Sequence, residues 1–222
     1  MSIDRVAVIG GTGDEGFGLS VRWATAGIHV TIGSRKQEKA DDAVRRLKEV
    51  VPEASVDGLE NPEAAASSDV VVVTIPFSGQ GAIYRSIADS LREGAIVVDC
   101  TVPVEAAVGG KATRVLGVWE GSAAQLAQSL LPKGIKMCAA FHSLAAAALN
   151  DIEHTMEGDV LVCGPKASKP TVEELVDAIP GLRYVDAGPL ENARIIEPIT
   201  SLLIGINHRY NTDRAGIHIT GI

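Results

Sequence analysis

Two hydrophobic patterns alternate along the first 140 residues, short unbroken apolar runs and longer stretches with helical spacing. The unbroken runs are typical of strands covered on both faces of a sheet, and they lie at residues 6–9, 28–32, 70–75, 95–99 and 135–140. The helical spacing predicts helices at residues 36–50, 63–67, 82–91 and 122–131. This alternation predicts an α/β protein with a doubly wound parallel sheet of the Rossmann type.

The pattern changes after about residue 143. It predicts four short elements, two helices at residues 145–149 and 171–179 and two strands at residues 159–163 and 182–186. The second of these helices opens with a capping box formed by Thr171 and Glu174. A longer helix at residues 190–210, bent at Pro198, carries more apolar residues than one face of a small domain needs. The excess predicts a subunit interface, although a core helix buried on two sides would show the same pattern.

The composition narrows the classes of protein to which the chain can belong. Of its 222 residues 46% are hydrophobic and 22% charged, and the net charge of −8 gives no electrostatic case for binding nucleic acid or an anionic membrane. No apolar run reaches transmembrane length, and the first strand begins too early to leave room for a signal peptide. Three cysteines lie in or beside apolar runs, which predicts buried, reduced thiols of a cytoplasmic protein: Cys100, Cys138 and Cys163.

A glycine motif follows the first predicted strand. Gly11, Gly13 and Gly16 have the spacing Gly-x-Gly-x-x-Gly and lead into a helical pattern, which is the arrangement of dinucleotide-binding sites. The first glycine allows a tight turn, the second lets the backbone approach a pyrophosphate, and the third lets the helix pack closely on the strand. The N-terminus of that helix adds positive potential for the phosphates.

The end of the second predicted strand indicates NADP as the dinucleotide. A site for NAD has an Asp or Glu here to bind the ribose hydroxyls, whereas this chain has Ser34 and Arg35. Lys39 lies one helical turn beyond Arg35, so both cations can converge on one phosphate. The alternative is that both are solvated charges at the start of a surface helix. Because they follow a dinucleotide motif, we favour the phosphate interpretation.

The fifth predicted strand ends at Phe141, His142 and Ser143, where His142 is a titratable side chain well placed for chemistry. Its alternative roles are to cap the next helix or to form a hydrogen bond between domains. The chain has no Tyr-x-x-x-Lys pair in its first half, no constellation for covalent catalysis and no cluster of metal ligands. An enzyme can dispense with these groups if its second substrate is itself a redox cofactor, since hydride then passes between two stacked rings.

The chain resembles, nearly from end to end, the reduced coenzyme F420:NADP oxidoreductases. These enzymes exchange hydride between NADP and an 8-hydroxy-5-deazaflavin coenzyme. The resemblance is carried by Gly10-Gly11-Thr12-Gly13, Ile32-Gly33-Ser34-Arg35, Lys39, Thr74-Ile75-Pro76, Val102-Pro103-Val104, Val162-Cys163-Gly164, Asp186-Ala187-Gly188-Pro189-Leu190 and Glu191-Asn192-Ala193-Arg194. It implies an NADP-binding Rossmann domain (residues 1–143), a small C-terminal α/β domain for substrate and dimerisation (residues 144–222), and a homodimer formed through the C-terminal helix.

The resemblance also implies roles for individual residues. The pyrophosphate would meet the glycine loop at Gly11, Thr12, Gly13, Asp14 and Glu15. The 2′-phosphate would be held by Ser34, Arg35 and Lys39, and the nicotinamide side would be lined by Ile75, Pro76, Val102 and Ala146. The deazaflavin would lie against His142, Ser143 and Leu144, with Ile206 and Asn207 nearby. His142 would orient the rings and carry no proton, because hydride transfer requires none.

One segment departs from the pattern of that family. Ser78-Gly79-Gln80-Gly81 replaces bulkier residues after the Thr-Ile-Pro block, which predicts a wider pocket. Two alternatives to the deazaflavin reaction therefore remain. The first is an NADPH-dependent reductase of another acceptor, such as a flavin, a quinone or a metal chelate. The second is an NADP(H)-sensing protein without turnover.

Overall fold

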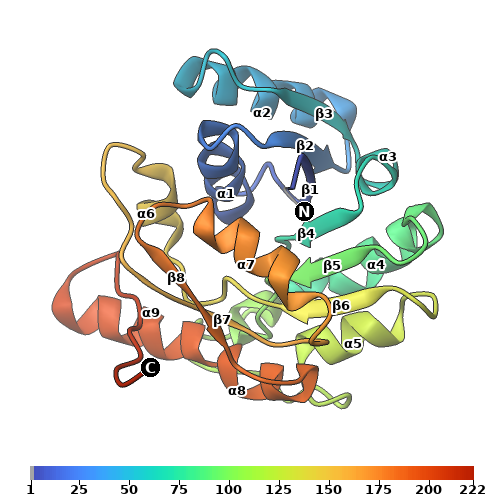
Figure 1. Cartoon of the computed structure of the whole chain (residues 1–222). Helices are drawn as coiled ribbons and strands as arrows, with labels where there is room; N and C mark the ends of the chain where they lie inside the picture. The colour runs from blue at the N-terminus through green and yellow to red at the C-terminus, as the bar shows by residue number, and fades with distance from the viewer. Residues whose placement is uncertain (1–2) are drawn as a thin grey trace.

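The computed structural model describes residues 3–222, and its main sheet has six parallel strands in the order β3-β2-β1-β4-β5-β6 (Figure 1). The strands are β1 (Arg5–Ile9), β2 (His29–Ser34), β3 (Val56–Glu60), β4 (Val70–Val73), β5 (Ile96–Asp99) and β6 (Lys136–Ala139). The strand order reverses between β1 and β4, which creates the crevice where doubly wound sheets bind ligands. The predicted Rossmann-type α/β fold is confirmed.

Alternation of side chains along the strands builds two cores on opposite faces of the main sheet. The covering helices are α1 (Asp14–Thr25), α2 (Gln37–Val50), α3 (Asn61–Ala66), α4 (Gln80–Ile87), α5 (Ala123–Ser129) and α7 (Lys169–Asp177). Val6 and Val8 of β1 pack in the core under α1, α2 and α7. Ala7 and Ile9 pack in the core under α3, α4 and α5. The predicted helices thus cover both faces of the sheet.

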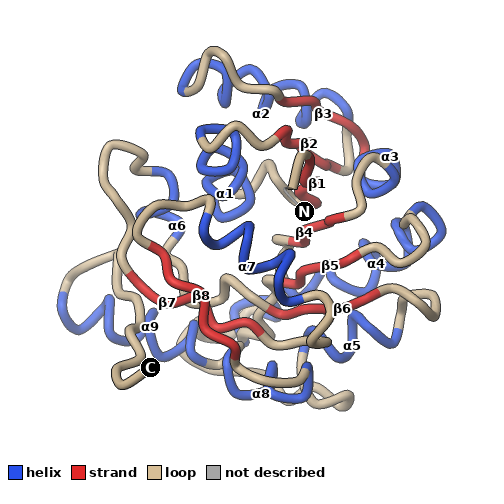
Figure 2. Tube along the Cα trace, in the orientation of Figure 1, coloured by secondary structure: helices blue, strands red, loops and turns tan. Residues whose placement is uncertain are grey.

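The C-terminal part adds a second, two-stranded parallel sheet (Figure 2). Its elements are α6 (Ala146–Asn150), β7 (Gly158–Val162), β8 (Leu182–Asp186), α8 (Ala193–Ile196) and α9 (Ile199–Tyr210). Two hydrogen bonds between Ala139 and Cys163, of 2.9 and 3.0 Å, join this sheet to the end of β6. The buried Arg22 of α1 donates to the carbonyl oxygens of Leu149 (2.9 Å) and Ala148 (2.8 Å). These bonds hold α6 against α1.

The predicted capping box of Thr171 and Glu174 is wrong. Helix α7 begins at Lys169, with Pro170 in its first turn, so Thr171 lies inside the helix. Proline has a backbone φ suited to the start of a helix and no N–H to satisfy there, which lets the helix begin earlier than the box predicts. The carboxylate of Glu174 instead accepts a hydrogen bond of 3.1 Å from the backbone N–H of Ile3.

The predicted long helix at residues 190–210 is broken rather than bent. Helix α8 ends at Ile196 and α9 begins at Ile199, since Pro198 has no N–H to continue the helical ladder. Glu197 at the break is buried, and its carboxylate accepts hydrogen bonds from the backbone N–H groups of Ala123 (2.8 Å) and Ala124 (3.0 Å). The break is therefore fixed to the N-terminus of α5.

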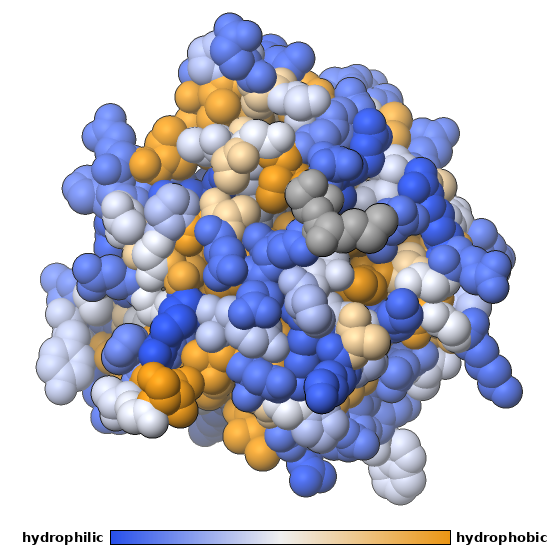
Figure 3. Space-filling view, viewed as in Figure 1, coloured by the Kyte–Doolittle hydropathy of each residue, from blue (hydrophilic) through white to orange (hydrophobic). Residues whose placement is uncertain are grey.

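The visible face of the molecule is mixed in hydropathy, and the three cysteines are buried. On the face shown in Figure 3, hydrophobic residues form separate clusters among hydrophilic ones. Cys100, Cys138 and Cys163 are buried free thiols, as predicted. Across residues 3–222 no helix has the length and apolar character needed to cross a membrane.

Candidate functional site

The glycine loop lies between β1 and α1 at the carboxyl edge of the main sheet. Gly10 has a φ of +82°, and its N–H donates to the carbonyl oxygen of Gly33 at 3.2 Å. Gly13 occupies the N-cap of α1, where no side chain caps the helix. The N–H groups of the first helical turn are thus available to a ligand, and the helix dipole favours an anion at this position.

The third glycine of the motif is required by close packing. A Cβ atom at Gly16 would collide with the hydroxyl oxygen of Thr74 and lie 2.8 Å from the carbonyl oxygen of Gly10. Thr74 Oγ1 also donates to the carbonyl oxygen of Ile9 at 3.2 Å, which ties β4 to β1. The loop can adopt this shape only with glycine at position 16.

A cavity of about 580 Å³ opens beside the glycine loop. It brings together seven residues predicted from the sequence: Thr12, Gly13, Ser34, Arg35, Lys39, Ile75 and Pro76. Gly11 and Glu15 belong to the same loop and first helical turn but do not line this cavity, and the side chain of Asp14 is exposed. Val102 and Ala146 do not line it either. Strand ends that are far apart in the sequence therefore converge on one space, as expected at a switch point.

Three cations border this cavity, and one of them was not predicted. Arg35, Lys36 and Lys39 are exposed, and within residues 3–222 none of them forms an ion pair with a carboxylate. Lys36 lies between the two predicted cations in the sequence, which is the signal that could have identified it. A cluster of unpaired cations with a guanidinium among them is suited to binding a phosphate.

Asn61 is a second lining residue that the sequence pattern did not predict. It is buried at the start of α3, and its Oδ1 atom has no hydrogen-bond partner among the described residues. That oxygen lies over the end of β2, since a Cβ atom at Gly33 would be 3.1 Å from it. Buried acceptors in proteins are nearly always paired, so a donor on a bound ligand would complete this site.

Burial raises the pKa of two acidic side chains near the loop, Glu15 and Asp99. Burial, and to a lesser extent the nearby Asp99 carboxylate, raises the pKa of Glu15 to about 8. Asp99 accepts hydrogen bonds from Gln80 (3.1 Å), Tyr84 (2.9 Å) and Thr101 (2.7 Å), yet burial still raises its pKa to about 7. At neutral pH Glu15 therefore adds little negative charge beside a phosphate site.

The Ser78-Gly79-Gln80-Gly81 segment divides into two parts. Ser78 and Gly79 line the cavity, and a Cβ atom at Gly79 would meet no heavy atom of the described chain within 4 Å. The wall is open at this point. Gln80 is instead buried and holds Asp99, so it does not contribute to the width of the cavity.

The turn after β6 holds His142 in a buried and unpaired state. Phe141 has a φ of +70°, which is strained for a bulky residue, and its ring packs edge-on against Trp23 at 5.7 Å. Neither ring nitrogen of His142 has a partner within the described part of the chain, and burial lowers its pKa to about 3. The imidazole is neutral, and it makes neither of the structural contacts considered as alternatives.

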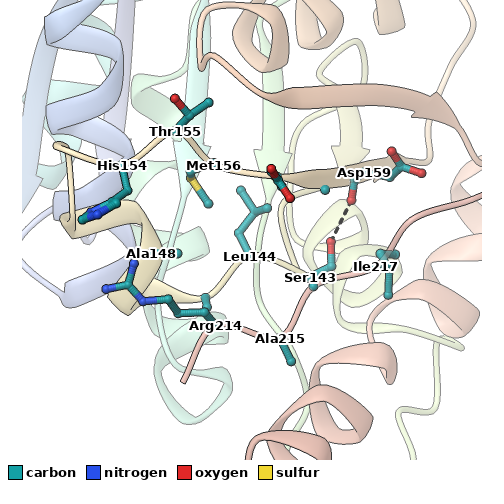
Figure 4. A pocket seen from close by; sticks show the side chains of 14 residues that line it. Ser143, Leu144, Ala148, His154, Thr155, Met156, Asp159, Arg214, Ala215 and Ile217 are labelled. Atoms are coloured by element: carbon teal, nitrogen blue, oxygen red, sulfur yellow. Dashed lines mark hydrogen bonds between the residues drawn. The ribbon is translucent and has the colours of Figure 1, made fainter. Parts of the chain in front are cut away.

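Ser143 and Leu144 lie at a second, smaller cavity of about 200 Å³ (Figure 4). Figure 4 shows Leu144 and Met156 on one wall, and residues 214–217 of the C-terminal tail on another. Ser143 donates a hydrogen bond of 3.1 Å to the carbonyl oxygen of Asp159. Leu144 therefore presents an apolar side chain beside the His142 turn.

The other two residues predicted to lie near the deazaflavin, Ile206 and Asn207, do not line the cavity beside Leu144. Ile206 lines a separate groove of about 570 Å³ on α9. The side-chain oxygen of Asn207 accepts a hydrogen bond of 3.0 Å from the backbone N–H of Ala215, so Asn207 anchors the C-terminal tail. No group of three or more His, Cys, Asp or Glu residues among positions 3–222 is arranged to hold a metal ion.

The sequence is similar to known proteins over nearly its whole length. The family described as "NADP oxidoreductase coenzyme F420-dependent" matches residues 5–103. The F420-dependent NADP reductase of Methanothermobacter thermautotrophicus is 44% identical, covering 98% of this chain and 95% of that protein. The enzyme of the same name from Methanocaldococcus jannaschii is 41% identical, covering 98% and 99%.

Two further similarities say less about function, the first because it covers only part of the relative and the second because its sequence identity is low. The rat metalloreductase STEAP3 is 30% identical over 90% of this chain but only 37% of its own length. A structure from Arthrobacter sp. FB24, assigned as an F420-dependent NADP reductase, superposes with a TM-score of 0.82 over 99% of this chain and 100% of that one. At 22% identity this structure shows the fold alone. The resemblance inferred from the sequence blocks is confirmed by the archaeal relatives, and the chain belongs to the family of coenzyme F420-dependent NADP oxidoreductases.

Proposed function

We propose that this chain transfers a hydride directly between NADP(H) and the deazaflavin coenzyme F420. The observation that carries the proposal is the cavity in which the glycine loop meets Arg35, Lys36 and Lys39. Relatives that are 40–44% identical over nearly the full chain are named for this activity. The chain is thus an NADP-dependent oxidoreductase whose two substrates are both coenzymes.

The residues around the larger cavity would hold NADP. The free N–H groups at the start of α1 bind the pyrophosphate, and Arg35, Lys36 and Lys39 with the Ser34 hydroxyl bind the 2′-phosphate. Asn61 Oδ1 accepts a hydrogen bond from the adenosine half. Ile75 and Pro76 supply the wall on the nicotinamide side. Val102 and Ala146 lie outside this cavity, so their proposed contact with the nicotinamide would have to be made beyond its lining.

The turn after β6 would receive the deazaflavin. The hydride itself carries no proton, and the one proton that the deazaflavin takes up on reduction can come from solvent, so the chain needs no general acid and mainly contributes alignment of the two rings. Leu144 gives an apolar contact to the ring, and Ser143 fixes the turn. The neutral His142 ring has one donor and one acceptor without partners among the described residues, but both nitrogens are buried, so a hydrogen bond from it to the coenzyme rings would require the turn to open.

His142 gives the protein a pH-dependent stability with a definite sign. Its pKa is near 6.5 in an unfolded chain and about 3 in the folded protein. Between these values the unfolded state binds the proton, so the free energy of unfolding should fall as the pH drops below about 6.5. In urea unfolding at a series of pH values, His142→Asn should give a flatter acid limb. Equal slopes in His142→Asn and the wild type would contradict the assignment.

Leu144→Ala should impair the proposed deazaflavin site and leave the NADP site intact. Loss of the ring contact should slow single-turnover hydride transfer by roughly 10- to 100-fold, the range expected for misaligned reactants. The dissociation constant for NADPH should change little. Leu126→Ala, on a half-buried side chain of α5, is the matched control. An equal loss of NADPH affinity in Leu144→Ala would place Leu144 at the wrong ring.

The alternative acceptors are tested by one comparison of substrates. The similarity to a rat metalloreductase makes a metal chelate the strongest alternative, although that similarity spans little over a third of the rat protein. NADPH oxidation should be measured with F420, a free flavin, a quinone and a ferric chelate. We expect F420 to give the highest kcat/KM by far. Preference for another acceptor would contradict the proposed reaction, and tight NADPH binding without turnover would indicate a sensor.

We also propose that the protein acts in the cytoplasm as a homodimer formed through its C-terminal helices. Three large apolar side chains on α8 and α9 are exposed: Ile195 (59%), Leu202 (63%) and Tyr210 (78%). A second copy of the chain would cover them. The three free cysteines support a reducing compartment. Residues 1–143 would then hold NADP, while residues 144–222 provide the deazaflavin contact and the interface.

A further inference from the structure

Trp119 is 99% exposed, although tryptophan is normally buried over most of its surface. It lies in the segment between β5 and α5, which has an ordered backbone. Val104 and Val115 form an antiparallel bridge, and the N–H of Leu116 donates to the carbonyl oxygen of Pro103 at 2.7 Å. The indole is therefore held out from the surface by a defined loop.

A groove of about 570 Å³ runs along α9 beside this same segment. Its apolar lining comes from Val115 of the loop and from Pro198, Leu202 and Ile206 around α9. Two basic residues that follow on α9, His208 and Arg209, line the same groove. The volume is ample for an indole, and the apolar walls match its hydrophobic rings.

We propose that Trp119 of one protomer fills the α9 groove of a second copy of the chain, and that the second copy does the same in return. The proposal rests on the proposed homodimer and specifies its anchor. The loop that carries Trp119 also contributes Val115 to the groove, so donor and acceptor belong to one continuous surface. A two-fold dimer requires such a self-complementary surface.

Charge supports a second copy as the occupant. Glu120 follows Trp119 directly, and in the dimer its carboxylate would approach His208 and Arg209 of the other protomer. Each chain carries a net charge of −8, so a local pairing of opposite charges would offset part of the repulsion between the copies. An aromatic side chain in a pocket at the centre of an interface commonly dominates its affinity.

Fluorescence tests the proposal directly, because the chain has two tryptophans and Trp23 is fully buried. The difference between the wild type and Trp119→Phe isolates the emission of Trp119. We expect that emission to be blue-shifted and protected from acrylamide where sedimentation shows a dimer, and to become accessible on dilution. Trp119→Ala should weaken dimerisation by roughly 30-fold or more, the lower limit for an interface hot spot.

Variants in the groove give the reciprocal test. Leu202→Glu should dissociate the dimer and expose Trp119 without changing the emission of Trp23. Val50→Glu, on an apolar side chain of α2 that is 43% exposed, should leave both unchanged. A stable dimer in which acrylamide quenches Trp119 freely would overturn the proposal, and so would a dimer that survives Trp119→Ala with unchanged affinity. A wild type that stays monomeric would overturn the dimer as well, while the transfer of hydride to F420 is measured independently.

Discussion

Replacing Arg35 with glutamate is expected to weaken NADPH binding by roughly 30- to 1000-fold, or about 2–4 kcal/mol, because a charge-paired phosphate contact becomes a repulsion. The affinity for NADH should change little, since NADH lacks the 2′-phosphate. The physical basis is the position of Arg35 on the cavity wall beside Lys36 and Lys39, where it has no protein carboxylate to pair with among residues 3–222. Titration with each coenzyme, followed by nicotinamide fluorescence, measures both constants.

The control for this prediction is a second exposed arginine. Arg85→Glu makes the same change of charge on α4, where the guanidinium donates to a carbonyl oxygen of its own helix and, within residues 3–222, has no ion-pair partner. It should leave the ratio of NADPH to NADH affinity unaltered. If Arg35→Glu binds NADPH as tightly as the wild type, the 2′-phosphate does not lie at this cluster.

Substitution of Gly16 by alanine should disable the nucleotide site through packing alone. The added Cβ would collide with Thr74 Oγ1 and crowd the Gly10 carbonyl oxygen and the Gly11 Cα at 2.8 and 2.9 Å. Two of these neighbours are backbone atoms, which cannot move away by changing a rotamer. We expect a loss of about 1–3 kcal/mol in the free energy of unfolding, typical of overpacking. NADPH affinity should fall as well, because the loop must shift.

Gly79→Ala is the matched control, since Gly79 lines the same cavity and has open space where the Cβ would be placed. It should retain wild-type stability. Urea unfolding and coenzyme titration of the two variants separate the effect of close packing from that of glycine itself. A Gly16→Ala protein with unchanged stability and affinity would show that the loop does not have the shape described.

The sequence alone could predict the main sheet because most of its strands are buried on both faces and leave an unbroken apolar signal. Strand β3 was not predicted, because it lies at the edge of the sheet and its five residues include Asp57, Gly58 and Glu60. Asn61 was missed for the same reason, since it follows a strand that was not predicted. Helix boundaries at Pro170 and Pro198 depended on how proline is accommodated, which a periodic pattern does not reveal.

The features of the candidate site also include some that the sequence could predict and some that it could not. Ser34, Arg35 and Lys39 follow from local rules about the strand after a glycine loop, and these residues meet in one cavity. The neutral states of Glu15 and His142 arise from burial by segments far away in the sequence, so residue spacing could not predict them. Leu144 and Ile206 line two different cavities. Which cavity Ile206 lines depends on how α9 packs, and residue spacing does not reveal that packing.

Single-turnover reduction of F420 by NADPH deuterated at C4 tests the proposed reaction most directly. The visible absorbance of oxidised F420 should bleach rapidly with NADPH and slowly with NADH. In ordinary water, deuterium from one of the two C4-labelled stereoisomers should appear in the reduced F420, because the hydride passes directly from ring to ring. Tight NADPH binding without bleaching, or label lost to the solvent, would contradict direct hydride transfer between the two coenzymes.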